Sequence, residues 1–140
     1  MRPLHLRLQA FGSYPGEEVV DFTLFNGIGT FLVTGPTGSG KTTVFDAMVY
    51  ALYGELPGQR KGEGETRSHH ADPAVETFVE FEFEVDGARY KVRRSPQQER
   101  QAKRGSGTAQ QAATAMLAKI QPDGSAVSIA TKATACSKEC

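Results

Sequence analysis

The stretch 35–42 reads GPTGSGKT and matches the pattern G-x-x-x-x-G-K-[ST] at every fixed position. Just upstream lies an apolar segment of strand-forming residues, Phe31-Leu32-Val33-Thr34, and just downstream the stretch from Thr43 to Tyr53 has a helical pattern. This order predicts a buried strand that passes through a glycine-rich loop into the start of a helix. The two flanks favour phosphate binding over the alternative, a glycine-rich turn before an ordinary helix.

The residue types of this loop (the P-loop) explain how it would hold a nucleotide. Its glycines allow the chain to curl until successive backbone N–H groups surround a polyphosphate, and the helix dipole adds positive charge. Lys41 is placed to reach the β- and γ-phosphates, and the Thr42 hydroxyl can complete the coordination of Mg²⁺, which makes Thr42 the predicted metal ligand. The predicted nucleotide-binding residues are Gly35, Pro36, Thr37, Gly38, Ser39, Gly40, Lys41, Thr42 and Thr43.

The composition is that of an ordinary globular chain. With 140 residues, 39% of them hydrophobic and 23% charged, the chain can form one domain, and its formal net charge of +0 gives no argument for nucleic-acid binding. No apolar run has membrane-spanning length, and the start, MRPLHLRLQAF, alternates polar and apolar residues unlike a signal peptide. We expect a cytoplasmic location, no membrane partner, and free thiols at Cys136 and Cys140.

Alternating residues predict two strands before the P-loop strand. The first runs from Pro3 to Phe11, and a turn at 12–16 leads to the second, from Glu18 to Leu24; a loop at 26–29 follows. One face of the first strand carries Leu4, Leu6 and Leu8.

The helix after the P-loop shows an apolar stripe at positions i, i+3, i+4 and i+7. The stripe consists of Phe45, Met48, Val49 and Leu52. We expect these side chains to be core residues that cover a sheet, and Gly54 to end the helix. The polar, aperiodic segment from Glu55 to Ala74 predicts a long exposed connection.

A hairpin is predicted over residues 77–94, with its turn at Asp86-Gly87. In the two-residue type I′ form the register pairs Glu84 with Arg89, Glu82 with Lys91, Glu80 with Arg93, Phe83 with Tyr90 and Phe81 with Val92. One face is then charged and the other apolar, and we interpret the charges as a solvated surface. A second hairpin is predicted over 115–131, with its turn at Pro122-Asp123-Gly124.

Between the hairpins, residues 95–114 are rich in Gln, Ala, Gly and Ser, and we predict a flexible loop. The cationic residues at its start and in its first half are Arg93, Arg94, Arg100, Lys103 and Arg104. Such a cluster can meet DNA phosphate or an acidic partner, and the alternative is a solubilising, disordered hairpin tip.

Three segments, in this order, resemble the N-terminal part of the SbcC family. They are MRPLHLRLQAFGSYPGEEVVDFT, FLVTGPTGSGKTTVFDAMVYALYGELPG and SHHADPAVETFVEFEFEVDGARYKVRRSPQ. The family supplies the ATPase subunit of the SbcCD nuclease and is similar to SMC-like DNA-repair ATPases with an ABC-type head. The resemblance implies an α/β fold for residues 1–140: the N-terminal half-lobe of an ABC-type P-loop NTPase, with antiparallel β hairpins. It also implies that the Phe11-Gly12-Ser13-Tyr14 turn lies near the base or ribose.

The resemblance also implies cofactors and partners. ATP with Mg²⁺, held between two such heads, would couple to an SbcD-type nuclease subunit that processes DNA ends and hairpins at the nucleoid. In the family, a coiled coil and a C-terminal half complete the head, and neither is found in these 140 residues. The chain has no hhhhDE run and no LSGGQ-like signature, so no catalytic residue is identified. We expect these residues alone to bind Mg-ATP weakly and hydrolyse it negligibly.

Two other hypotheses use the same loop. A small-molecule or nucleotide kinase needs an arginine-rich lid and an acceptor pocket, which two hairpins after the helix fit poorly. A non-catalytic module could use nucleotide only to switch a binding interface. A GTPase is disfavoured because the sequence has no N-K-x-D motif.

Overall fold

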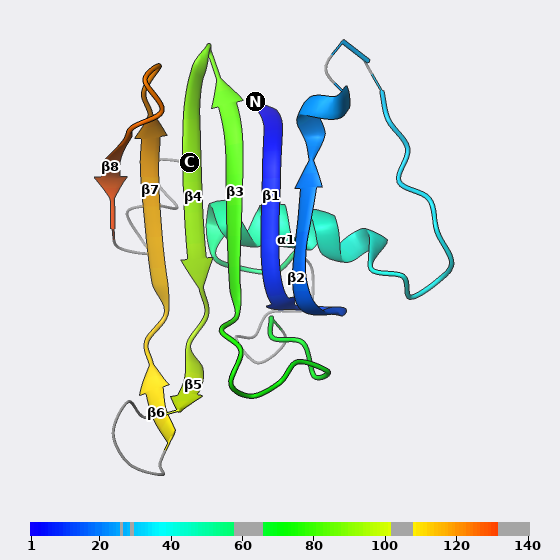
Figure 1. The fold of residues 1–140 in the computed structure, drawn as a ribbon. Coiled ribbons are helices and arrows are strands. Elements are labelled where there is room, and N and C mark those ends of the chain that lie inside the picture. The colour runs from blue at the N-terminus through cyan, green and yellow to red at the C-terminus, as the bar shows by residue number, and fades with distance from the viewer. Residues whose placement is uncertain (26, 29, 58–65, 102–107, 132–140) are drawn as a thin grey trace.

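The computed structural model describes residues 1–25, 27–28, 30–57, 66–101 and 108–131. Their helices and strands are β1 (Arg2–Phe11), β2 (Tyr14–Asp21), the 3-10 helix η1 (Phe22–Phe25), α1 (Lys41–Tyr53), β3 (Phe78–Val85), β4 (Ala88–Ser95), β5 (Gln98–Gln101), β6 (Thr108–Gln111), β7 (Thr114–Ile120) and β8 (Ala126–Ala130). Six strands form one antiparallel sheet in the order β2-β1-β3-β4-β7-β8, and α1 crosses one face of it (Figure 1). Within the described ranges, no helix is long and apolar enough to span a membrane.

Strand β1 lies inside the sheet and pairs with both β2 and β3. Leu4, Leu6 and Leu8 are buried on one face, as the alternation predicted. The second strand begins earlier than predicted, at Tyr14, and ends at Asp21. There the Asp21 carboxylate accepts hydrogen bonds from the backbone N–H and the hydroxyl of Thr23, at 2.9 and 2.5 Å, which turns the chain out of the strand and into η1.

The hairpin of β3 and β4 has the predicted register. Asp86 and Gly87 have φ values of 49° and 78°, so both turn residues are left-handed, as the type I′ form requires. All five predicted cross-strand pairs are present: Glu84–Arg89, Glu82–Lys91, Glu80–Arg93, Phe83–Tyr90 and Phe81–Val92. The apolar pairs face α1, and Phe81, Phe83 and Val92 are buried.

The other face of the hairpin carries a ladder of ion pairs. Lys91 contacts Glu82 at 2.7 Å and Glu80 at 3.3 Å. His5 on β1 lies between Glu82 and Asp21, with nitrogen–oxygen distances of 3.3 and 3.4 Å. These contacts connect side chains of β2, β1, β3 and β4, although each partly exposed pair contributes little by itself.

Helix α1 packs on β1, β3 and β4 with a face that shares only the buried Leu52 with the predicted stripe. Its buried residues are Asp46, Ala47, Tyr50, Ala51 and Leu52. The predicted stripe is wrong at Phe45, which is 47% exposed, and Met48 and Val49 are only partly buried. The small side chains of Ala47 and Ala51 let the helix approach the sheet closely, and this orientation turns Phe45 away from it.

The C-terminal end of α1 is fixed by a glycine and a buried arginine. Gly54 has φ 79°, and its N–H donates to the Tyr50 carbonyl at 2.7 Å, which confirms the predicted end of the helix. Arg94, only 3% exposed, donates from Nε to the Ala51 carbonyl at 2.6 Å and from Nη2 to the Leu52 carbonyl at 3.0 Å. The guanidinium therefore satisfies carbonyls that the last turn leaves without helical partners.

The prediction of a flexible loop over 95–114 is partly wrong, because β5 and β6 pair as a two-stranded ribbon. Residues 102–107 lie outside the described ranges. The ribbon begins at Gln98, whose buried side chain accepts from the Thr77 N–H at 2.7 Å and donates to the Thr77 carbonyl at 3.1 Å. The second predicted hairpin is present as β7 and β8.

The connection after α1 is less exposed than predicted. Thr66 and Ser68 are buried, and the Gly12 N–H donates to the Thr66 carbonyl at 2.9 Å. The Ser68 N–H donates to the Ala10 carbonyl at 2.8 Å, so this segment lines the end of β1. Residues 58–65 of the predicted connection lie outside the described ranges.

The predicted strand at Phe31–Thr34 does not form. Leu32 is 84% exposed, and none of the described strands pairs with this segment, which Figure 1 shows running outside the sheet. A strand needs neighbours for its N–H and C=O groups, and here the N-terminal hairpin pairs directly with β3. The first and later hairpins therefore form one continuous sheet instead of flanking a P-loop strand.

Replacing Arg94 by methionine should lower the free energy of unfolding by about 2 to 4 kcal/mol, because two buried carbonyls lose a charged donor. The matched control Arg89→Met, on the same strand, removes an exposed ion pair with Glu82 and should cost less than about 1 kcal/mol. Denaturant unfolding measures both. Equal losses would contradict the capping role of Arg94.

The ion-pair ladder predicts a pH-dependent contribution from Glu82. Burial pushes the pKa of Glu82 upward, but hydrogen bonds and charges from Lys91 and His5 outweigh it and hold the pKa below its ordinary 4.5. A lowered pKa in the folded state adds stability above pH 4.5 that is lost as the pH falls through the folded value. Glu82→Gln should therefore be destabilised at pH 7, and its difference from wild type should shrink below pH 4.5.

Thermal unfolding across pH measures this difference. The control Glu84→Gln removes an ion pair with Arg2, whose side chain is 52% exposed, and should cost less at pH 7. If the stability difference between wild type and Glu82→Gln stays constant as the pH falls, the lowered pKa of Glu82 is contradicted.

Candidate nucleotide-binding site

The P-loop enters α1 through two left-handed glycines. Gly38 and Gly40 have φ values of 83° and 84°, which side chains rarely tolerate. Gly40 is the N-cap, and its carbonyl accepts the first helical hydrogen bond, from the Val44 N–H at 3.3 Å. The N–H groups of the first helical turn therefore remain available at the helix end that attracts anions.

Lys41 lies folded over the loop. Its Nζ donates to the carbonyls of Gly35 and Pro36, at 2.8 and 2.7 Å. A Cβ placed on Gly35 would lie 2.8 Å from Ser39 Oγ and 3.9 Å from Lys41 Cδ, so a side chain at position 35 would fill the inside of the loop. A curled loop with an ammonium group on its own carbonyls carries the groups that a polyphosphate site needs.

The predicted site residues 35–43 lie together at the start of α1. Thr42 is exposed in the first turn of α1, and a hydroxyl is one of the hard oxygen donors that suit Mg²⁺. Asp46, in contrast, is buried in the next turn. Among the described residues no cluster of three or more His, Cys, Asp or Glu residues could hold a metal. The nucleotide and Mg²⁺ contacts of residues 35–43 stay predictions.

The turn between β1 and β2 packs directly against the P-loop. Ser13 Oγ and Thr43 Oγ1 lie 2.8 Å apart, and the Tyr14 hydroxyl donates to the Gly40 carbonyl at 3.2 Å. Burial, with a contribution from Glu18, raises the pKa of Tyr14, which keeps this phenol a donor. Residue pattern alone did not connect positions 13 and 43; only the family resemblance placed this turn near the nucleotide.

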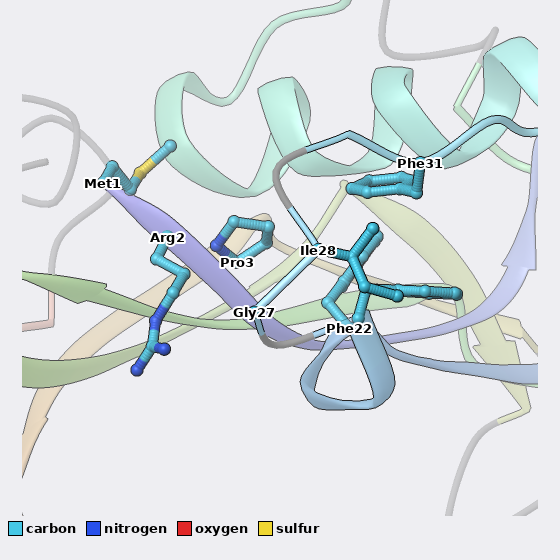
Figure 2. A pocket seen from close by; sticks show the side chains of 8 residues that line it. Met1, Arg2, Pro3, Phe22, Gly27, Ile28 and Phe31 are labelled. Carbon is cyan, nitrogen blue, oxygen red and sulfur yellow. The ribbon is translucent and has the colours of Figure 1, made fainter.

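A pocket with a volume of about 250 Å³ lies at the N-terminal end of β1. It is lined by Met1, Arg2, Pro3, Phe22, Phe25, Gly27, Ile28 and Phe31 (Figure 2). The Phe31 ring stacks on Phe25 at 5.1 Å and lies 5.9 Å from the Phe22 ring. None of the predicted nucleotide-binding residues lines this pocket.

Two residues of the predicted basic cluster, Arg93 and Arg94, lie on opposite faces of β4. Arg94 is buried under α1 and cannot meet DNA phosphate. Arg93 lies over the Phe78 ring at 3.7 Å and pairs with Glu76 and Glu80 at 3.7 and 3.8 Å. Lys103 and Arg104 lie outside the described residues, as does the side chain of Arg100, so the prediction for these three stays untested. The prediction from sequence proximity was wrong for Arg93 and Arg94 because neighbouring residues of a strand point to opposite faces.

A P-loop that opens a helix, with that helix packed on an antiparallel sheet, is the arrangement of an ABC-type N-terminal lobe, in the class of P-loop NTPases. Residues 5–125 match the family model described as AAA domain, and the chain belongs to this family.

Two relatives are named as the SbcC component of the nuclease SbcCD. The Vibrio cholerae protein is 45% identical over 124 residues, and the Lactococcus lactis protein is 43% identical over 118 residues. These matches cover 89% and 84% of this chain but only 12% and 11% of the relatives. Among solved structures, the SMC head domain from Thermotoga maritima matches with 25% identity and a TM-score of 0.47, over 91% of this chain and 39% of that one.

The two left-handed glycines provide a matched test of the packing between the loop and the turn. A Cβ on Gly40 would lie 2.7 Å from the Tyr14 ring and 2.8 Å from Ser13 Oγ, whereas a Cβ on Gly38 would meet nothing within 4 Å. Gly38→Ala should cost about 1 to 2 kcal/mol from backbone strain alone. Gly40→Ala should lower the free energy of unfolding by at least about 1 kcal/mol more, because its Cβ would overpack the contact with the turn. Denaturant unfolding measures both variants. Equal losses in the free energy of unfolding would contradict close packing between Gly40 and the turn.

Proposed function

We propose that this chain is the ATP-binding, N-terminal part of an SbcC-type ATPase that acts in DNA repair and recombination. The observation that carries the proposal is the P-loop at the start of α1, in a chain 45% identical to the SbcC component of a nuclease SbcCD. Such an ATPase would couple ATP binding and hydrolysis to the processing of DNA ends and hairpins by a partner nuclease.

Different groups of the P-loop would bind different parts of Mg-ATP. The backbone N–H groups between Gly35 and Lys41 would hold the phosphate oxygens, and Thr42 would supply a hydroxyl ligand to Mg²⁺. Lys41 would exchange its two carbonyl acceptors for the β- and γ-phosphates. Bound Mg²⁺ would neutralise charge that develops on the phosphates during hydrolysis.

Binding and hydrolysis would depend on different parts of the protein. Residues 1–140 supply the phosphate-binding loop, but their sequence carries no hhhhDE run to place a water-orienting carboxylate, and Asp46 is buried. We propose that a coiled coil and a C-terminal half of the head complete the site in the whole protein. The partners would be a second head, an SbcD-type nuclease subunit and DNA, and the location the cytoplasm at the nucleoid.

Replacing Lys41 by alanine should weaken Mg-ATP binding by at least about tenfold, because the phosphates lose a charge-assisted donor. Lys119→Ala, which removes an exposed lysine from β7, is the matched control and should leave affinity unchanged. Isothermal titration calorimetry on the whole protein that carries this chain measures both. Equal affinities for wild type and Lys41→Ala would overturn the proposed site. Steady ATP hydrolysis by residues 1–140 alone, lost in Lys41→Ala, would contradict the proposed division of labour.

A further inference from the structure

The turn at Gly12-Ser13 brings a second hydroxyl to the start of α1. Ser13 Oγ lies 2.8 Å from Thr43 Oγ1, although 30 positions separate the two residues in the sequence. Next to this contact, the Tyr14 hydroxyl donates to the Gly40 carbonyl at 3.2 Å. The turn is thus joined to both the P-loop and the first turn of the helix.

Further contacts pack the turn and its neighbours against α1 and the segment at Thr66. Its preceding residue, Phe11, is buried and packs its ring 5.5 Å from that of Tyr50 on α1. The Gly12 N–H is held by the Thr66 carbonyl at 2.9 Å, and a Cβ on Gly12 would lie 2.6 Å from Thr43 Cγ2. The spacing between Ser13 and Thr43 is therefore set by the packing of β1 on α1.

A hydroxyl has one proton to donate and two lone pairs to accept with. If Ser13 donates to Thr43 Oγ1, the Thr43 proton is free to point toward an anion at the helix end. In that order each hydrogen bond polarises the next, which strengthens the final bond to a phosphate oxygen. In the reverse order the Thr43 proton would be used within the protein, and Thr43 could offer a phosphate oxygen only repulsive lone pairs.

We propose that Ser13 is a positioning residue for nucleotide: it donates to Thr43 and so directs the Thr43 hydroxyl proton to a phosphate oxygen. This inference rests on the proposed function, because it requires a polyphosphate in the P-loop. Ser13 acts here through Thr43, which differs from a direct contact between the turn and the base or ribose.

A double-mutant cycle on the whole protein distinguishes these two roles, with Mg-ATP affinity measured by calorimetry. Ser13→Ala should weaken binding by about fivefold to tenfold, the value of one hydrogen bond. In a Thr43→Ala background the same change should have no further effect, since the hydroxyl that it orients is gone. In a Thr43→Ser background, which keeps a hydroxyl, the loss on Ser13→Ala should return.

Ser128→Ala, at an exposed position on β8, is the matched control and should bind like wild type. A Ser13→Ala protein with wild-type affinity would overturn the inference, and so would an equal loss in the Thr43→Ala background, which would indicate a direct contact. In both cases Lys41→Ala would still weaken binding strongly, so the proposed function would stand. Wild type without Mg-ATP binding would overturn the proposed function and this inference together.

Discussion

The position of α1 on the sheet is the constraint on which the rest of the structure depends. A helix can present its N–H groups to an anion only if its axis is fixed, and here both ends are held. At the C-terminal end the buried Arg94 guanidinium binds the carbonyls of Ala51 and Leu52. At the N-terminal end Ser13 and Tyr14 contact the P-loop and the first turn. Strand β4 and the turn from β1 into β2 therefore locate opposite ends of the same helix.

Local chemistry made part of this fold predictable. Asp86-Gly87 imposes a left-handed pair of turn residues, and from that turn the whole register of β3 and β4 follows by counting. The helix boundary at Gly54 was equally local, because a left-handed glycine closes the last turn. The P-loop itself could be found because its glycines, lysine and threonine must follow one another at fixed spacing.

Features that depend on distant partners were not predictable in the same way. The periodicity of α1 predicted that an apolar stripe through Phe45 would pack on the sheet. In the structure the face with the small residues Ala47 and Ala51 packs there instead. Adjacent arginines looked like one basic cluster, yet Arg94 is buried under the helix while Arg93 lies on the charged face. The Ser13–Thr43 contact spans two elements and left no periodic signal in the sequence.

The folded-back position of Lys41 bears on how a nucleotide would bind. With its Nζ on the carbonyls of Gly35 and Pro36, the lysine connects the helix start to the first residues of the loop. A polyphosphate would replace two neutral acceptors by charged ones, and charge-assisted hydrogen bonds are about twice as strong as neutral ones. The exchange therefore favours ligands with several phosphate oxygens within reach of one ammonium group. A nucleoside, which carries no phosphate, would leave Lys41 on its internal acceptors and gain little from the loop.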